Sequence, residues 1–331
     1  MIALIAIILY TFRDLAGPIL HELRETTPWV VIIISLSSVC YELVEGWITC
    51  SFAKHYNPAF TYRMGVESAF FCSFYRVATL GSGAGIAAVY YFNEKGIAIS
   101  KGTGMYMVEY VLHKLGIAIF SALLFACSYG FMHQHYAEYT WMLAGAYALT
   151  FVIALALLLV CCSKRIHGML LWILDKLNKK GRFRREEAML REQFLILEDA
   201  ASELLTDRRF VCSVLGKNLI KFAFWYVIPY FVLADTGLID PVQAMAVTSL
   251  AVMIAAVIPA PAGIGSSEFV ITMLFGTIVG AGEAGSTSLL YRFATFALPF
   301  AVGAAVVLIR RVRLRKMKKT EKEEVVNENR I

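Results

Sequence analysis

The sequence predicts an all-α, polytopic membrane protein, a helical bundle with about six spanning helices and two re-entrant, broken-helix hairpins. Three observations predict this class. The 331 residues are 59% hydrophobic and 17% charged, with a mean hydropathy of +0.64, which excludes a water-soluble globular protein. Several apolar runs are long enough to cross a bilayer. Glycine-rich breaks at 81–85 and 259–265 interrupt further apolar segments, one in each half of the chain.

Five apolar runs reach or exceed the roughly 20 residues that a helix needs to cross about 30 Å of hydrocarbon. They are Trp29–Phe52, Met105–Phe131, Trp141–Cys162, Phe210–Ala234 and Ser288–Ile309. The apolar segment Met1–Phe12 is about half the necessary length and lacks the basic segment and cleavage site of a signal peptide. We interpret it as a short or N-terminally clipped first helix.

The basic residues predict the orientation of the chain. Lysine and arginine cluster in Lys164–Arg191 and Arg310–Lys319, whereas Asp235–Asp240 carries only acids. By the positive-inside rule, we expect the connector 164–209 and both termini to lie in the cytoplasm. The net charge of +6 therefore indicates orientation and contact with anionic lipid, and we expect no nucleic-acid partner.

This orientation places both ends of residues 64–99 on the cytoplasmic side. The segment holds two arms of about 14 to 17 residues, too short for spans, so we expect a hairpin that enters from the cytoplasm. Residues 239–281 begin and end outside, with arms of about 20 residues that also allow two full spans. Hairpins entering from opposite faces would form an inverted repeat, although the sequence similarity between the halves is too weak to establish one.

Residues 1–315 are expected to form a single transmembrane domain. Within its connector, apolar residues recur at three- and four-residue spacing over Arg184–Arg208, which predicts an amphipathic helix on the cytoplasmic surface or against the bundle. A solvated connector with one buried face is the simpler alternative. The charged tail 316–331 is predicted to be a disordered cytoplasmic segment.

The second break has a composition that suits an anion site. Proline disfavours helix and glycine permits tight backbone, so a helix should restart near Ser266, which can cap it, with amides pointing into the break. Glu268 lies in its first turn, where a carboxylate is costly unless it meets a partner, although it could only stabilise the helix dipole or pair with a basic neighbour. A connection without a ligand remains the alternative. The residues expected to form the two breaks are Gly81, Gly83, Gly85, Pro259, Pro261, Gly263 and Gly265.

Several charged residues within apolar segments are candidates for a polar site. Arg76 lies one turn before the first break and suits a phosphate group, or an ion pair with Glu67, Glu42 or Glu45. Arg292, at the outer end of the last span, could bind a headgroup or snorkel to the surface. Three residues, Glu109, His113 and Lys114, could form a proton relay or bind a headgroup. A structural pair near the membrane surface is the equal alternative. Lys217 and Lys221 are predicted to snorkel as surface anchors.

No catalytic motif and no metal-binding spacing occurs in the sequence, so we expect no metal and no cofactor. The seven cysteines lie almost wholly in apolar runs without a CxxC or Cys/His spacing, as buried small hydrophobic residues do. Any chemistry is therefore expected to occur within the membrane.

Two stretches resemble a known family. Leu80–Thr103, beginning Leu-Gly-Ser-Gly-Ala-Gly, is similar to a glycine-rich break followed by an aromatic arm, a basic-glycine turn and a new helix. Pro259–Glu268, Pro-Ala-Pro-Ala-Gly-Ile-Gly-Ser-Ser-Glu, is similar to a proline, glycine-x-glycine, glutamate signature. Both resemble the lysylphosphatidylglycerol synthase transmembrane family, the flippase-like half of the bacterial multiple peptide resistance factor. The chain departs from the family at Gly85–Ala87, where a polar residue and a proline are usual.

The resemblance implies a lipid flippase or translocase that moves a phospholipid, plausibly aminoacylated as in lysylphosphatidylglycerol, between leaflets, with a link to antimicrobial resistance. Under this hypothesis Arg76 and Arg292 receive the phosphate, Ser266 and Ser267 add donors, and Glu268 meets a cationic headgroup or balances an arginine. Synthesis of the lipid is not expected, because the aminoacyltransferase domain is missing. The alternatives are a membrane-embedded transferase using a lipid-linked donor and a non-catalytic partner of a separate lipid synthase; a homodimer is also compatible with the sequence.

Overall fold

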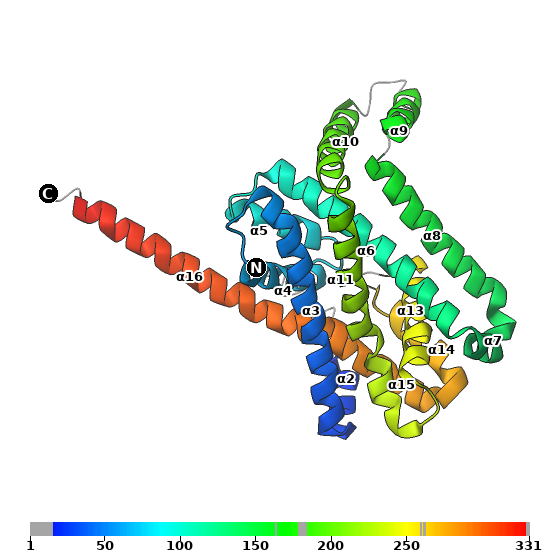
Figure 1. Cartoon of the computed structure of the whole chain (residues 1–331). Helices are drawn as coiled ribbons and strands as arrows, with labels where there is room; N and C mark the ends of the chain where they lie inside the picture. The colour runs from blue at the N-terminus through cyan, green and yellow to red at the C-terminus, as the bar shows by residue number, and fades with distance from the viewer. Residues whose placement is uncertain (1–15, 163, 178–183, 259, 261–262, 329–331) are drawn as a thin grey trace.

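The computed structural model describes residues 16–162, 164–177, 184–258, 260 and 263–328, and these residues contain helices and no strand (Figure 1). The helices are α2 (Ala16–Glu25), α3 (Pro28–Tyr56), α4 (Tyr62–Ala78), α5 (Ala84–Glu94), α6 (Ile99–Cys127), α7 (Tyr129–Tyr136), α8 (Thr140–Cys162), α9 (Lys164–Leu177), α10 (Arg184–Leu204), α11 (Arg208–Tyr226), α12 (Ile228–Leu233), α13 (Pro241–Val257), α14 (Ser266–Val279), α15 (Ala281–Arg292) and α16 (Leu298–Glu328), with short helical turns η1 (Ala137–Tyr139), η2 (Ala234–Thr236) and η4 (Phe293–Ala297). The all-α class is confirmed, and the predicted first helix Met1–Phe12 lies outside the described residues.

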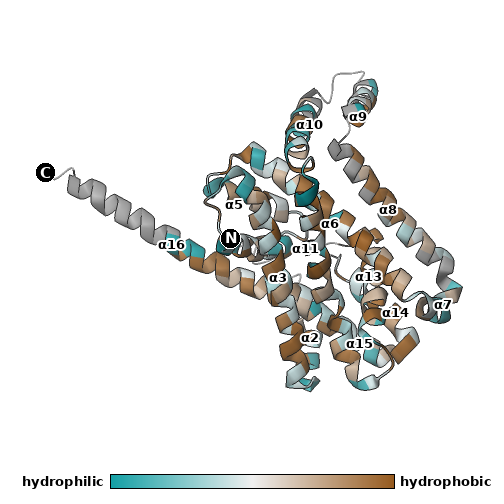
Figure 2. Ribbon diagram, in the orientation of Figure 1, coloured by the Kyte–Doolittle hydropathy of each residue, from teal (hydrophilic) through white to brown (hydrophobic). Residues whose placement is uncertain are grey.

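Within the part of the chain that the structure describes, four helical segments are long and apolar enough to cross a membrane, which makes the chain an integral membrane protein. They are Pro28–Tyr56, Ile99–Cys127, Arg208–Thr236 and Ala281–Arg313. The fifth predicted span, Trp141–Cys162, forms the 23-residue helix α8, so the total of six spans stays a prediction. Hydrophobic residues run along α3, α6, α8 and α13, whereas hydrophilic residues gather on α10 (Figure 2).

The first break lies between two short helices and comprises residues 79–83, so Gly81 and Gly83 lie in it, whereas Gly85, which we also expected there, lies in the first turn of α5. α4 has 17 residues and α5 has 11, so at 1.5 Å per residue α5 spans only about half of the hydrocarbon. Leu80 and Gly81 both adopt positive φ angles, 53° and 102°, which turn the chain between the arms. The Gly83 amide donates to Thr79 Oγ1 at 2.6 Å and satisfies a backbone group at the turn.

The second break also joins two short helices. α13 has 17 residues, and its N-terminus is closed by a capping box between Asp240 and Gln243. α14 has 14 residues, about 21 Å, which is shorter than a span and favours a hairpin over two full spans. Pro259 and Pro261, which we expected to break the helix, lie outside the described residues.

One helix beside each break packs against a long helix of the opposite half of the chain. In the first half α4 packs on α16, where the rings of Phe74 and Phe300 stack with centroids 5.3 Å apart. In the second half α13 packs on α6. The long helices α3 and α11 also pack together, with the rings of Tyr41 and Trp225 stacked at 3.5 Å. The inverted repeat stays a prediction.

The connector helix α10 lies against the bundle rather than on open solvent. Ala200 and Leu204 are buried, and Ala200 packs so closely on α6 that a Cβ on Gly104 would lie 2.5 Å from its Cβ. Lys101 Nζ also donates to Asp199 Oδ2 at 2.6 Å. The sequence predicted this amphipathic helix either on the cytoplasmic surface or against the bundle. In the structure it packs against the bundle.

The C-terminal helix α16 differs from expectation. It continues to Glu328 and projects away from the bundle, whereas the sequence led us to expect a disordered segment from residue 316 (Figure 1). Lysine and glutamate are good helix formers, and a helix that has already started adds each further residue without a new nucleation cost. A highly charged composition therefore permits helix in this segment.

Candidate functional site

Buried charge is concentrated around a cavity of about 310 Å³ between α3, α4, α5, α6 and α11, which we call the first-break cavity. Arg76 and Gly81 line it from the first hairpin. The other charged or titratable groups used below are Glu45, Glu109, His113, Lys114 and Lys221. The cavity therefore contains both signs of charge next to one of the two predicted breaks.

Lys221 is the most buried cation of this cavity. Only 1% of its side chain is exposed, and its Nζ donates to Glu45 Oε2 at 2.7 Å. The same Nζ lies 2.9 Å from His113 Nδ1. Because an ammonium group can only donate, Nδ1 accepts and His113 is neutral in this contact.

The prediction that Lys221 snorkels to the surface is therefore wrong. Snorkelling needs a path along the helix to water, but Lys221 points between three long helices. A signal was present in the sequence, because Asn218 and Lys221 stand three residues apart on an otherwise apolar helix and share one face. Such a polar face within a span indicates an interior position rather than the membrane surface.

Arg76 reaches an acidic partner through a serine. Its Nη2 donates to Ser73 Oγ at 2.8 Å, and that hydroxyl donates to Glu42 Oε1 at 2.8 Å. Glu42 is 1% exposed. Of the three carboxylates considered as partners for Arg76, Glu42 is therefore the one connected to it, through Ser73, and the guanidinium still lines the cavity.

The three possible relay residues all line the first-break cavity. Glu109 is 8% exposed and accepts a hydrogen bond of 2.8 Å from Thr49 Oγ1. His113 follows one helical turn later on α6 and contacts Lys221. Lys114 lies over the Tyr110 ring with Nζ 5.3 Å from the centroid. The structure thus brings Glu109 and His113 to the same cavity as Arg76.

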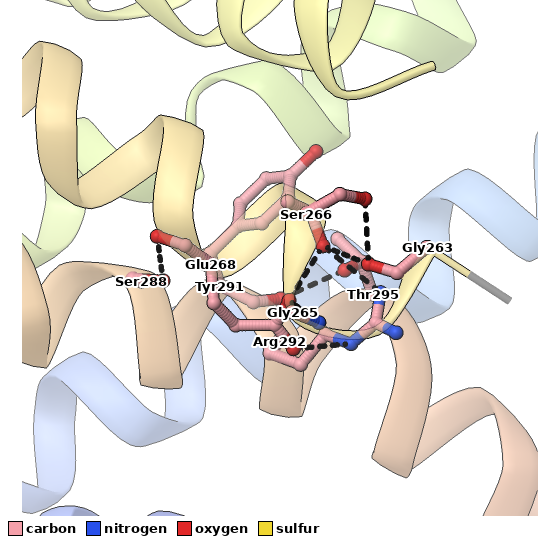
Figure 3. A network of polar contacts seen from close by, with 9 residues as sticks. Gly263, Gly265, Ser266, Glu268, Ser288, Tyr291, Arg292 and Thr295 are labelled. Atoms are coloured by element: carbon pink, nitrogen blue, oxygen red, sulfur yellow. Dashed lines mark hydrogen bonds and ion pairs between the residues drawn. The ribbon is translucent and has the colours of Figure 1, made fainter. Parts of the chain in front are cut away.

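The second break contains a separate polar cluster (Figure 3). Arg292 Nε lies 3.1 Å from Glu268 Oε1, with side chains 9% and 16% exposed, and Arg292 Nη1 donates to Ser267 Oγ at 3.3 Å. The Gly265 amide donates to Glu268 Oε2 at 2.9 Å. Ser267 Oγ lies 2.8 Å from the Gly263 carbonyl oxygen and 2.9 Å from Glu268 Oε2, so its one hydrogen has two acceptors.

The helix after the second break begins at Ser266, as predicted, but Gly265 is its N-cap residue. Ser266 Oγ instead donates to the Gly263 carbonyl at 3.3 Å. Glu268 caps the helix start because its carboxylate reaches back to the Gly265 amide, so it stabilises the helix terminus and pairs with a basic neighbour at once. Arg292 is followed directly by the π-helical turn η4, a distortion frequent at functional sites.

The two breaks differ in what their polar groups do. At the second break the arginine, the carboxylate and the Gly265 amide bind one another. At the first break Arg76 and Gly81 face a cavity large enough for several waters or a small polar group. The second-break residues Ser266, Ser267, Glu268 and Arg292 do not line that cavity. Among the residues searched, no group of three or more His, Cys, Asp or Glu could hold a metal ion.

Comparison with protein families finds one matching model, described as the lysylphosphatidylglycerol synthase TM region, over residues 1–303. The match includes both breaks and the first-break cavity. A search of curated proteins finds no match to the chain. The family resemblance of the two glycine-rich stretches is confirmed.

Proposed function

The chain belongs to the lysylphosphatidylglycerol synthase transmembrane family, and from this premise we propose that it moves a phospholipid between the two leaflets of the bilayer. The lipid handled by the family is a phosphatidylglycerol derivative by its description. The polar headgroup would pass through the protein while the acyl chains stay in the hydrocarbon. Such a path needs a polar, water-accessible cavity at membrane depth.

The single observation that supports this function best is the first-break cavity. It holds Arg76 and Lys221 beside Glu45 within a helical membrane bundle. Charged side chains at membrane depth are costly and typically mark a path for substrates or ions. A broken helix beside them is how secondary transporters build a binding site.

We assign the residues by charge. Arg76 and Lys221 would attract the phosphate, and the arginine fork matches its oxygens. Glu45 would release Lys221 toward the phosphate and meet any cationic group of the headgroup. At the second break the headgroup would be bound by Arg292, Ser266, Ser267 and Glu268. These residues would first have to break the contacts that they make with one another.

The orientation belongs to the same proposal. We place the protein in the bacterial cytoplasmic membrane with both termini and the basic connector in the cytoplasm, following the positive-inside rule. The first hairpin would then enter from the cytoplasmic face and the second from the outer face. Cysteine-accessibility labelling of Cys substitutions at Glu138 and Arg208 tests this: only the Arg208 position should react from the cytoplasmic side.

The decisive experiment measures lipid movement in vesicles of phosphatidylcholine and phosphatidylglycerol that contain the purified chain and a fluorescent phosphatidylglycerol. Quenching from outside reports how fast the inner-leaflet probe becomes accessible. Arg76→Ala and Lys221→Ala should slow this movement by about tenfold or more, since each removes a charge-assisted contact of about 1.5 to 3 kcal/mol. Arg292→Ala and Glu268→Gln should slow it as well.

Matched controls exist on the same helices. Arg63 is an exposed arginine on α4, and Arg63→Ala should move lipid at the wild-type rate. Glu283, exposed on α15, is the control for Glu268. Unchanged lipid movement in Arg76→Ala, Lys221→Ala, Arg292→Ala and Glu268→Gln together would contradict the assignment, as would wild-type vesicles that move no lipid.

A second candidate is a membrane-embedded transferase with a lipid-linked donor. The specific observation in its favour is that Glu109 and His113, the acid and base candidates, line one cavity. Incubation of the purified chain with a lipid-linked donor and phosphatidylglycerol, followed by mass spectrometry, separates the two functions. A transferase yields a new lipid mass, whereas a flippase changes only the leaflet.

A further inference from the structure

Glu109 differs from Glu45, the other carboxylate that lines the first-break cavity, because Glu45 pairs with Lys221. Glu109 is 92% buried, since 8% of its surface is exposed, and it accepts a hydrogen bond from Thr49 Oγ1. Among the described residues, no lysine, arginine or histidine nitrogen lies within ion-pair distance of it. A buried carboxylate without a cation is unstable as an anion and is neutralised by a proton or an external cation.

The other charges of the cavity are already engaged. Lys221 contacts Glu45 and His113, Arg76 donates to Ser73, and Lys114 lies over the Tyr110 ring. The charged groups that share the cavity with Glu109 are Glu45 from α3, Arg76 from α4, Lys114 from α6 and Lys221 from α11, with His113 from α6 as a neutral acceptor. The weaker acids are Tyr41 from α3, Cys72 from α4, and Tyr106 and Tyr110 from α6, while α5 contributes no titratable group to the lining.

From this geometry we propose that Glu109 is a proton-binding site, which exchanges its proton with water in the first-break cavity. Oε1 accepts from Thr49, so the proton binds Oε2, the oxygen left for the cavity. His113 is excluded because its Nδ1 faces an ammonium at 2.9 Å, and a proton there would place two cations in contact. A metal ion is disfavoured because Glu109 shares no cluster of three metal-ligating side chains among the residues searched.

The consequence of this proton site rests on the proposed function: proton transfer through Glu109 would be coupled to lipid movement. Glu109 would take a proton from hydronium on one side of the membrane and release it to water on the other, once for each lipid moved. No covalent bond of the lipid forms or breaks. The proton gradient would then supply the energy that the lipid movement needs, and a gradient of about one pH unit would support at most about a tenfold lipid asymmetry.

Two measurements on the full chain test the proton site and the coupling separately. The first is infrared difference spectroscopy between two buffers that both lie well above the ordinary carboxyl pKa of about 4, so that exposed carboxyls stay ionised in both. A protonated carboxyl band should appear in the less alkaline buffer for the wild type and be lost in Glu109→Gln. Glu138→Gln, an exposed acid outside the cavity, should keep the band. A band that persists in Glu109→Gln, or no band in the wild type, overturns the proton site whether or not lipid moves.

The second measurement records the steady-state distribution of fluorescent phosphatidylglycerol in vesicles with an imposed pH gradient. The wild type and Glu138→Gln should shift the distribution, and Glu109→Gln should lose the shift. Wild-type vesicles that move lipid but ignore the gradient overturn the coupling and leave the flippase function standing. Wild-type vesicles that move no lipid overturn the flippase function, and the coupling with it, while the carboxyl band still decides the proton site.

Discussion

Lys221 of α11 and Glu45 of α3 form an ion pair, with 2.7 Å between Nζ and Oε2, inside a membrane bundle. The lysine is 1% exposed and the carboxylate 29% exposed, so the pair lies at the wall of the cavity rather than in bulk water. His113 accepts from the same ammonium group and brings α6 into the contact. One lysine therefore joins three of the four helical segments that could cross the membrane.

Removing Lys221 should destabilise the protein. Lys221→Met leaves Glu45 with an uncompensated charge at a buried wall, and breaking such a pair costs about 3 to 5 kcal/mol. The double variant Lys221→Met with Glu45→Gln should recover part of that loss, since no charge is then left alone. Thermal unfolding in detergent measures both. Lys217→Met is the control, because Lys217 donates to the hydroxyl of Ser51 and lies over the Trp47 ring, and neither contact is a carboxylate ion pair. A Lys217 effect as large as the Lys221 effect would contradict this account.

The contact between α4 and α16 requires glycine at position 303. A Cβ there would overlap the carbonyl oxygen of Phe70 and lie 3.0 Å from Phe74 Cβ, so backbone would have to move. We expect Gly303→Ala to cost about 1 to 3 kcal/mol, the usual range for overpacking. Gly145→Ala on α8 is the control, because its Cβ meets nothing within 4 Å and alanine favours helix by about 1 kcal/mol. Equal unfolding temperatures for the two variants would argue against this helix contact.

Substitution of Gly265 should lower the free energy of unfolding through backbone strain alone. Its φ is 82°, where a side chain is strained, yet a Cβ would meet no atom within 4 Å. Gly265→Ala should therefore cost about 1 to 2 kcal/mol from backbone strain. Gly282→Ala, with equally open space, no positive φ and a place in helix α15, should not destabilise the protein and should stabilise it by up to about 1 kcal/mol. Chemical denaturation compares the two, and an equal effect would exclude the strain.

Arg292 and Glu268 should be energetically coupled. Their Nε to Oε1 distance is 3.1 Å and both side chains are largely buried, so the double-mutant cycle of Arg292→Gln and Glu268→Gln should give an interaction of about 0.5 to 3 kcal/mol. The cycle of Arg292→Gln with Glu283→Gln is the comparison, since Glu283 is exposed and forms no ion pair with Arg292 among the described contacts. Unfolding free energies that simply add for Arg292 and Glu268 would show that the pair contributes nothing.

Much of the fold followed from local sequence features. Apolar length predicted α3, α6 and α8, and the glycines at 81–85 predicted the turn between α4 and α5, because helix propensity and hydropathy act along the chain. The restart of a helix at Ser266 was predicted by the same logic. The extent of α16 was not predicted, because a charged composition alone does not distinguish a helix from a disordered segment.

The candidate site was harder to predict than the fold. Arg76, Glu109 and His113 were found because a charge in an apolar run is conspicuous, but Lys221 was misinterpreted as a surface residue. A lysine near the end of a span can turn outward or inward, and the direction depends on what the neighbouring helices offer. Thr49 was found by the structure alone. Glu45 was considered only as a partner of Arg76, and its pairing with Lys221 was missed, because neither spacing nor residue type points across 60 or more residues to a partner.

The sequence by itself determined that this chain is a helical membrane protein with a glycine-rich break in each half, because those properties depend on the bilayer thickness and on backbone hydrogen bonding within short segments. Only the tertiary structure decided how the charges pair. It joined Arg292 to Glu268 at the second break and gathered Arg76, Glu109 and Lys221 around a cavity at the first. Pairing acts through space over a few ångströms, so it depends on how the helices pack against one another.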